Sequence, residues 1–355
     1  MLAELNRALA ESGTGNAEVV RDLEARFAEF CGAAHALCVS SGTTALISAL
    51  LAAGVRPGDQ VGVSVLGPSM TGLAVTAAGA RPLFLDCAAP NSFGVSAAAA
   101  EHAIRAGITA AVLVPMWGYW DENEQALGAF RDAQVPIIVD AAQAPFLRLS
   151  KGLFSVADVV CLSLHGRKPF KAGEGGVCLT EIPRLAERIL ALRNFGQAAA
   201  FTGSRLDPTG PFAAHFGVNL KINGLGAAWC LSQLAEADRI RSRLDALRQA
   251  GMAVFGNTTI PWAEASQSPD VREHGRYGLV ALCPAENEAK ELARAIEASG
   301  VEVDSSRYKY RPMYDAPYLA RFTTECPIAE QLTATVVACR LEAFAARLES
   351  RKVTS

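Results

Sequence analysis

Short apolar runs alternate with helical patterns along the first half of the chain. The runs are rich in Val, Ile, Leu, Ala and Cys, which is typical of strands buried inside a sheet. Between most of them, apolar residues recur at the three- and four-residue spacing of a helix. This alternation predicts an α/β fold in which a mostly parallel seven-stranded sheet lies between helices on both faces. The predicted strands are 36–39, 61–65, 82–86, 110–114, 135–140, 159–164 and 176–180, and the predicted helices are 43–53, 69–78, 97–105 and 123–132.

The pattern changes near residue 195, and the rest of the chain predicts a different organisation. Gly, Pro and Asn scattered through 195–224 indicate a loop region. The elements beyond it are few and mixed, which is typical of a small α+β domain. We expect a large domain over 1–240, with an N-terminal helix at 17–31 that packs on the small domain, and a C-terminal domain over 241–355. The further predicted elements are helices at 225–250, 286–299 and 328–349 and a strand at 278–282.

Composition narrows the classes of partner. The chain has 355 residues, of which half are hydrophobic, and a formal net charge of −3. Since its basic residues are dispersed, nucleic acid is not an expected partner. The opening MLAELNRALAES has no continuous apolar stretch, and no run of about eighteen apolar residues occurs, so we expect neither a signal peptide nor a membrane span. Nine cysteines without a CxxC pair fit buried, reduced thiols, and the five histidines show no metal-ligand spacing. We therefore expect a cytoplasmic protein without a metal.

The carboxyl ends of the predicted strands are the expected place for a ligand, because open α/β sheets bind ligands at that edge. After the first strand, the small residues SSGTTA at 40–45 open a helix. Gly42, Thr43 and Thr44 would offer free amides and the positive end of the helix dipole to a phosphate. The alternative interpretation is a simple helix N-cap made by Ser or Thr.

Two further polar residues lie at strand ends. Asp140 closes an apolar run, and a carboxylate there is costly to bury unless it is paired, for example with a protonated ring nitrogen. Ser163 lies at the end of the strand at 159–164, and its hydroxyl can contact a phosphate. The alternatives are an aspartate that caps the next helix and an ordinary strand-end hydroxyl.

Lys168 lies in the stretch SLHGRKPFKAGEGG, at the mouth of the predicted sheet. Partial burial and neighbouring cations lower the pKa of an amine and make it a nucleophile. The alternative is a solvated loop lysine. Taken together, an amine, a buried carboxylate and a phosphate seat suit pyridoxal 5′-phosphate: Lys168 for the carbonyl, Asp140 for the ring nitrogen, and the 42–44 turn with Ser163 for the phosphate.

On these residues and their spacing, the sequence resembles the DegT/DnrJ/StrS aminotransferases, which are fold-type I enzymes that aminate keto-sugars and keto-cyclitols. The resemblance runs from about residue 13 to 235, and the order and spacing of the motifs match as well as the motifs themselves. The matching stretches are VSSGTTAL at 39–46, RPGDQV at 56–61, GARPLFLD at 79–86, DAAQA at 140–144, SLHGRKPFKAGEGG at 163–176, LRNFG at 192–196 and GVNLKING at 217–224.

The resemblance implies a role for several individual residues. Lys168, rather than Lys171, matches the Schiff-base lysine, because it lies five residues before the GEGG turn's Gly173. Asp140 matches the partner of the pyridinium nitrogen, and Gln143 matches a residue near the phenolic oxygen of the cofactor. Asn219 matches an asparagine that reaches the phosphate in the neighbouring subunit, which implies a homodimer with shared active sites.

The sequence also departs from the family. An aromatic-rich run usually follows the second strand and stacks on the cofactor ring, whereas here the stretch is SVLGPS at 64–69. Stacking would then come from an apolar side chain, from Pro68 or from elsewhere. The aromatic residues of MWGYW at 116–120 either line the pocket or pack at its rim. The stretch RYKYRPMY at 307–314 either supplies cations and phenols to the pocket or forms a solvated basic loop.

The expected reaction follows from the resemblance. Glu or Gln would donate an amino group, pyridoxamine 5′-phosphate would carry it as the intermediate form of the cofactor, and a keto-sugar or keto-cyclitol would accept it. Lys168 would serve as general base and acid. One alternative is a lyase, dehydratase or condensing enzyme with the same cofactor, and another is a non-catalytic regulatory protein on the same fold.

Overall fold

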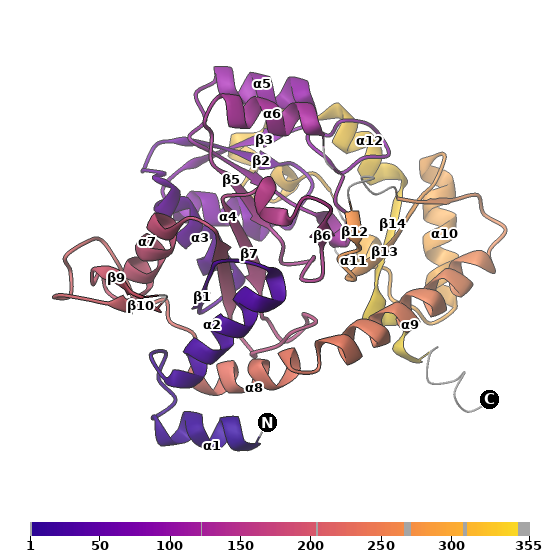
Figure 1. The fold of residues 1–355 in the computed structure, drawn as a ribbon. Helices are drawn as coiled ribbons and strands as arrows, with labels where there is room; N and C mark the ends of the chain where they lie inside the picture. Colours follow the sequence, from indigo (N-terminus) through magenta and orange to yellow (C-terminus); the bar gives the residue numbers. More distant parts are fainter. Residues whose placement is uncertain (1, 122, 204, 266–270, 308–310, 347–355) are drawn as a thin grey trace.

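The structure, a computed structural model, describes residues 2–121, 123–203, 205–265, 271–307 and 311–346. Its centre is a seven-stranded sheet with the order β1-β8-β7-β5-β4-β2-β3 (Figure 1). The strand β8 runs antiparallel to both β1 and β7, and all other neighbours are parallel. The predicted sheet is confirmed, with strand ends within two residues of those expected. The strands are β1 His35–Val39, β2 Gln60–Ser64, β3 Arg81–Leu85, β4 Ala110–Leu113, β5 Ile137–Asp140, β7 Val159–Ser163 and β8 Gly176–Thr180.

Helices cover both faces of this sheet, and each face has its own apolar core. Alternate residues of a strand point to opposite faces. In β1, Ala36 and Cys38 belong to one core and Leu37 and Val39 to the other. The helices α3 Gly42–Ala53, α4 Ser69–Ala77 and α7 Pro183–Arg193 pack on one face, and α2 Glu18–Cys31, α5 Ala97–Arg105, α6 Glu124–Asp132 and α8 Gly224–Leu234 contribute to the core of the other.

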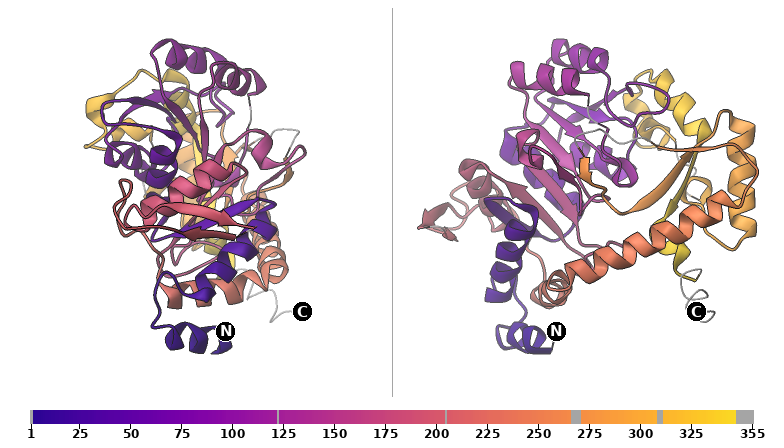
Figure 2. Two further views of the ribbon diagram at one scale, coloured as in Figure 1. Left: turned by 60° about the vertical axis from the view of Figure 1, so that its left-hand side comes forward. Right: turned by 45° about the vertical axis from the view of Figure 1, so that its right-hand side comes forward.

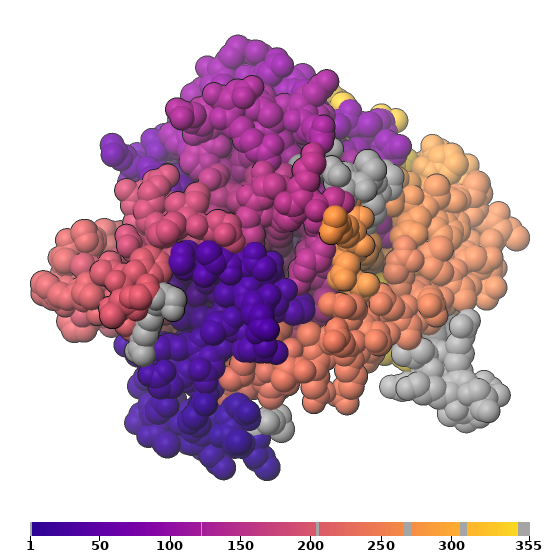
Figure 3. Space-filling view, viewed as in Figure 1, coloured from indigo at the N-terminus to yellow at the C-terminus, as the bar shows by residue number. Residues whose placement is uncertain are grey.

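The C-terminal part is built around a second, smaller sheet. Its three antiparallel strands have the order β11-β13-β14. Figure 2 shows this sheet and its helices beside the large sheet, joined to it by the long helix α9. A second link is the pairing of β12 with β6, and Figure 3 shows the orange β12 segment lying against the large-sheet half. The elements are α9 Ala237–Gly256, α10 Glu286–Ala298, α11 Asp304–Arg307, α12 Pro327–Thr335, β6 Arg148–Leu149, β11 Ala263–Glu264, β12 Val271–Glu273, β13 Gly278–Leu282 and β14 Val336–Arg340.

Two helices expected from the sequence are wrong in extent. The pattern at 225–250 is not one helix but two, because the chain breaks at Ala235 and Glu236 between α8 and α9. α8 packs against α1 (Leu2–Ala10) and α2, whereas α9 packs against β13, so each helix follows a different partner. The expected terminal helix at 328–349 ends at Thr335. The apolar residues after it form β14, which pairs with β13 along its whole length.

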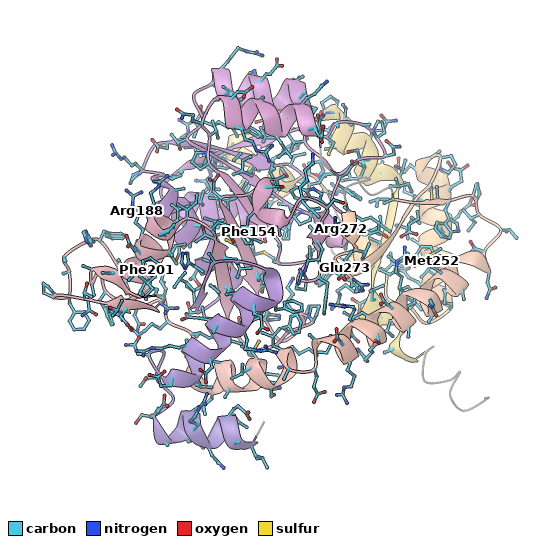
Figure 4. The ribbon with its side chains drawn as sticks, in the orientation of Figure 1. Phe154, Arg188, Phe201, Met252, Arg272 and Glu273 are labelled. Atoms are coloured by element: carbon cyan, nitrogen blue, oxygen red, sulfur yellow. The ribbon has the colours of Figure 1, made fainter. Side chains whose placement is uncertain are left out.

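The region expected to be a loop, 195–224, contains a short antiparallel hairpin. Its strands are β9 Ala199–Thr202 and β10 Arg205–Pro208. The hairpin projects from the body of the molecule, and Phe201, labelled in Figure 4, lies on it. Its ring contacts that of His35, with 4.9 Å between the ring centroids. Gly and Pro in this region therefore mark turns of a small sheet as well as irregular chain.

The domain division expected at residues 240 and 241 falls inside α9, and it stays a prediction. The N-terminal helix expected at 17–31 is α2, which packs against β1 and α8. Phe27 and Phe30 of this helix contact Phe170, which follows Lys168 by two residues. Among the described residues, no helix is long and apolar enough to cross a membrane.

Candidate active site

A tight turn between β7 and β8 presents Lys168. The carbonyl oxygen of His165 accepts a hydrogen bond from the Lys168 amide, with 2.8 Å between nitrogen and oxygen. The Nδ1 atom of the same histidine accepts one from the Arg167 amide at 3.2 Å. Gly166 donates to the carbonyl of Gly173, which has a positive φ of 80° that favours glycine. The turn is therefore held by its own backbone and by one imidazole ring.

The Lys168 side chain is half-buried, and its amine lies against another side chain. Its Nζ atom is 4.6 Å from the centroid of the Tyr277 ring. Burial lowers the pKa of this amine to about 8, although the charge of Asp140 acts in the opposite direction and Arg340 adds to the lowering. An amine with such a pKa is partly unprotonated near neutral pH. This half-buried setting favours the reactive amine over the alternative of a solvated loop lysine.

Asp140 ends β5 and is almost fully buried, with 5% of its surface exposed. Its Oδ2 accepts a hydrogen bond from the Thr71 hydroxyl at 2.6 Å, and its Oδ1 accepts one from the Ala142 amide at 3.2 Å. Burial raises the pKa of this carboxyl, whereas both hydrogen bonds and the charge of Lys168 lower it. The carboxylate thus has partners for both oxygens and is electrostatically linked to the lysine.

The N-terminus of α3 lies against the end of β7. A Cβ atom on Gly42 would come within 2.9 Å of the Ser163 Cβ, so glycine is required for this approach. Ser41 caps the helix, because its Oγ accepts a hydrogen bond from the Thr44 amide at 3.1 Å and the Thr44 hydroxyl accepts one from the Ser41 amide at 2.8 Å. The amides of Gly42 and Thr43 have no acceptor within the helix, by their position in it.

Gln143 contacts the segment that follows β4. Its side-chain Oε1 accepts a hydrogen bond from the Trp117 amide at 2.6 Å. Trp117 has a positive φ of 52°, and Gly118 beside it packs against the Gln143 carbonyl. The aromatic residues of this stretch, which the sequence assigned either to the pocket or to its rim, are buried. Tyr119 is fully buried and donates its hydroxyl proton to Glu264 at 2.6 Å, which favours packing.

Asn219 lies at the edge of the site and is exposed to solvent. Its Oδ1 accepts a hydrogen bond from the Lys221 amide at 3.4 Å. The next residue, Leu220, accepts a hydrogen bond from the amide of Ser40, which leads into α3. The segment that carries Asn219 is therefore attached to the same corner of the sheet as Gly42.

The structure brings the expected site residues to one edge of the large sheet. Thr71 and Tyr277 join them and were not expected from the sequence. A sequence pattern could have indicated Thr71, because its hydroxyl lies in the first turn of the helix that follows β2. Tyr277 had none, because it lies over a hundred residues from Lys168. Residues 308–310 of the basic stretch lie outside the described residues, and Met313 and Tyr314 are buried. The described residues contain no cluster of His, Cys, Asp or Glu that could hold a metal ion.

The model of the DegT/DnrJ/EryC1/StrS aminotransferase family matches residues 1–351, and the chain belongs to this family. Among curated proteins it is 29% identical to protein MosB of Rhizobium meliloti, over 76% of this chain but only half the length of that protein. It is 29% identical to the GDP-perosamine synthase of Caulobacter vibrioides, over 86% of this chain and 79% of the relative. It is also 29% identical to the L-glutamine:2-deoxy-scyllo-inosose aminotransferase of Streptomyces lividus, over 75% of this chain and 63% of the relative.

Solved structures agree on the fold. The crystal structure of 3-amino-5-hydroxybenzoic acid synthase superimposes with a TM-score of 0.80 at 22% identity, covering 98% of this chain and 94% of the other. The fold is that of the pyridoxal 5′-phosphate-dependent aminotransferases, as the resemblance implied.

Proposed function

We propose that this protein is an aminotransferase that binds pyridoxal 5′-phosphate through Lys168 and moves an amino group from Glu or Gln to a keto-sugar or keto-cyclitol. Family membership and the names of the relatives support the class of reaction. The observation that carries the site assignment is the electrostatic interaction between Lys168, whose amine has a pKa of about 8, and the buried carboxylate of Asp140. Such oppositely perturbed groups in a buried setting are typical of catalytic sites.

The residues at the sheet edge fit this cofactor. A dianionic phosphate needs amide donors and no neighbouring carboxylate, and the first turn of α3 has no acidic residue. Gly42 leaves room for the close approach of the helix to Ser163, whose hydroxyl lies beside those amides. Gln143 uses its side-chain oxygen on Trp117, so its amide group keeps its donors for the phenolic oxygen of the cofactor.

When bound, the cofactor supplies an aldehyde that accepts the amine and a ring that accepts electron density. Lys168 would form the covalent link and then take and return a proton, for which a pKa near the working pH is favourable. Asp140 would hold a proton at the ring nitrogen. Thr71 supports this task because its hydrogen bond opposes the rise in the pKa of the carboxyl that burial causes.

The proposal is tested in two half-reactions with the purified protein. Glu or Gln should convert the bound cofactor from its aldehyde to its amine form, seen by absorbance, and a keto-sugar or keto-cyclitol should reverse the change. Failure with Glu, Gln and Ala would favour the lyase alternative. Borohydride reduction and peptide mapping should then locate the cofactor on Lys168. A label on Lys171, whose backbone is bonded to Gln233 of α8, would overturn the site assignment.

We also propose that the chain forms a homodimer through an apolar patch beside Asn219. The patch consists of Phe195, Phe212, Phe216 and Val218, of which Phe212 and Phe216 expose 64% and 72% of their surface. The Phe195 and Phe212 rings contact each other, with 5.8 Å between their centroids, and exposed apolar residues that gather on a folded protein indicate an interaction surface. The patch lies next to Leu220, whose carbonyl accepts a hydrogen bond from the Ser40 amide. A second copy docked there would therefore reach the start of α3, where we propose that the phosphate binds.

The oligomeric state tests this surface. Phe216→Asp should shift the protein towards monomers in light scattering, because a carboxylate would be buried without a partner. The matched control is Asn287→Asp, which adds the same charge to the exposed first turn of α10. A Phe216→Asp variant that stays dimeric with an unchanged unfolding temperature would contradict the proposed interface.

A further inference from the structure

A segment of the C-terminal half, residues 274–278, reaches across to the large sheet. The amide of Gly275 donates to the carbonyl of Gly118 at 3.1 Å. The contact is closer than side chains allow, because a Cβ atom on Gly275 would come within 2.6 Å of the Gly118 Cα. Gly278 similarly approaches the Trp117 side chain, where an added Cβ would meet its Cβ at 2.9 Å. Two glycines of one half thus fit against the loop that also holds Gln143.

The same segment is fixed from its other side by the small sheet. The Tyr277 carbonyl accepts a hydrogen bond from the Leu341 amide at 3.0 Å, and Gly278 lies opposite Arg340 in the pairing of β13 with β14. Arg340 in turn binds Asp304, with 3.2 Å between its Nε and the Asp304 Oδ1. Tyr277 therefore has a defined backbone position between the two halves. Figure 4 labels Arg272 and Glu273, which precede the segment, in the space between them.

From this position the Tyr277 ring lies against the Lys168 amine, with 4.6 Å between Nζ and the ring centroid. The face of an aromatic ring attracts an ammonium group and gives it a preferred place. We propose that Tyr277 is a positioning residue for Lys168, and that the close contact of Gly275 with Gly118 sets the place of its ring. The role of Lys168 itself rests on the proposed function.

Three charged residues also affect the pKa of the Lys168 amine, besides the Tyr277 ring. Asp140 favours the ammonium form of Lys168, Arg340 disfavours it, and Asp304 favours it. All three act over a distance, and the residue whose ring lies against the nitrogen is Tyr277. Since a ring face stabilises the cation, its removal lowers the pKa of Lys168 further.

The test measures Lys168 directly, in the full-length chain freed of cofactor. Trace labelling with acetic anhydride across pH, read by peptide mass mapping, gives the pH midpoint at which the amine becomes reactive. We expect a midpoint near pH 8 for the parent protein. Tyr277→Leu, which keeps an apolar side chain but removes the ring, should lower it by about half a unit. Tyr277→Phe keeps the ring and should keep the midpoint.

The backbone contact has its own variant. Gly275→Ala should shift the midpoint in the same direction as Tyr277→Leu, because the added methyl group displaces the segment. Gly128→Ala is the matched control: it lies within α6, where an added Cβ meets nothing within 4 Å. Should Tyr277→Leu fail to fold, Tyr277→Met serves in its place.

Each outcome decides the proposal. An unchanged or raised midpoint in Tyr277→Leu would overturn the role of the ring, and so would an equal fall in Tyr277→Phe. A parent-like midpoint in Gly275→Ala would overturn the role of the backbone contact. These results do not depend on cofactor binding, so a failure of the proposed aminotransferase activity would be seen separately, in the mapping of the borohydride adduct.

Discussion

The two halves of the molecule contribute to the site in different ways. The large sheet brings its residues by local rules: Asp140 ends a strand, Gly42 opens a helix after a strand, and Lys168 lies in a turn between strands. The small-sheet half contributes Tyr277, whose carbonyl accepts a hydrogen bond from the Leu341 amide and whose segment is held to Gly118 by the amide of Gly275. The first half supplies groups that can react, and the second half supplies a surface that places one of them.

This difference is also a difference in how each half can fail. A change to a reacting group of the first half, Lys168 or Asp140, removes a chemical group, so its effect should be large and should not be rescued by a similar shape. A change in the second half displaces a group that is still present, so its effect should be smaller and graded.

Lys168→Ala should have the largest effect. It removes both the covalent attachment and the proton carrier, so turnover should fall by about 10³-fold or more. The measurement is the steady-state rate with Glu or Gln and a keto acceptor. Lys171→Ala, three residues on in the same turn, is the matched control and should retain activity. If Gly275→Ala were as damaging as Lys168→Ala, the division between reacting and placing residues would be wrong.

Asp140→Asn should rank second. It keeps the shape of the side chain but removes the charge that favours the ammonium form of Lys168 and a protonated ring. Turnover should fall by about 10²-fold, as is usual when one electrostatic group of an active site is lost. The sign of a second effect follows from the same charge: the labelling midpoint of Lys168 should fall below its value near pH 8. A raised midpoint would show that the two groups are not linked.

How far the sequence predicts the fold differs between the halves for a physical reason. Strands of the large sheet are buried on both faces, so they read as continuous apolar runs, and a parallel order follows from their alternation with helices. The run at 336–340 is equally apolar, but it directly follows a helical pattern, so local preference predicts that the helix continues through it. Its partner β13 is over fifty residues away, and this pairing, not local preference, makes it a strand.

The site divides in the same way. Lys168, Asp140 and Gly42 each carry a local signature, because a strand end and a turn lie beside them in the sequence. Thr71 carries a weaker one, since its place depends on β2 and β5 being near each other in the sheet. Tyr277 carries none. Its position depends on the close backbone contact between Gly275 and Gly118, which no local sequence pattern predicts.

His165→Ala should have an intermediate effect, although this residue belongs to the first half. Its ring accepts the Arg167 amide and so shapes the turn that presents Lys168. Loss of one such hydrogen bond is worth about 1 kcal/mol, so turnover should fall roughly fivefold. His165→Asn should restore most of the activity, because an asparagine oxygen also accepts the amide two residues on. Equal loss in both variants would mean that the ring acts otherwise than by holding the turn.

Glu174→Gln should have the smallest effect. Its carboxylate lies 3.6 Å from the Nε2 of His165, but the two side chains expose 70% and 45% of their surface. Exposed ion pairs are screened by water and contribute little, so turnover should change by less than about twofold. Comparison with His165→Asn separates the roles of the two ring nitrogens of His165. The asparagine keeps the hydrogen bond from the Arg167 amide, which Nδ1 accepts, but loses the contact of Nε2 with Glu174. Glu174→Gln removes only the charge of the carboxylate. A larger loss of turnover in Glu174→Gln than in His165→Asn would assign Glu174 a part in the reaction. The turn would then contain reacting residues besides Lys168, as well as residues that only place it.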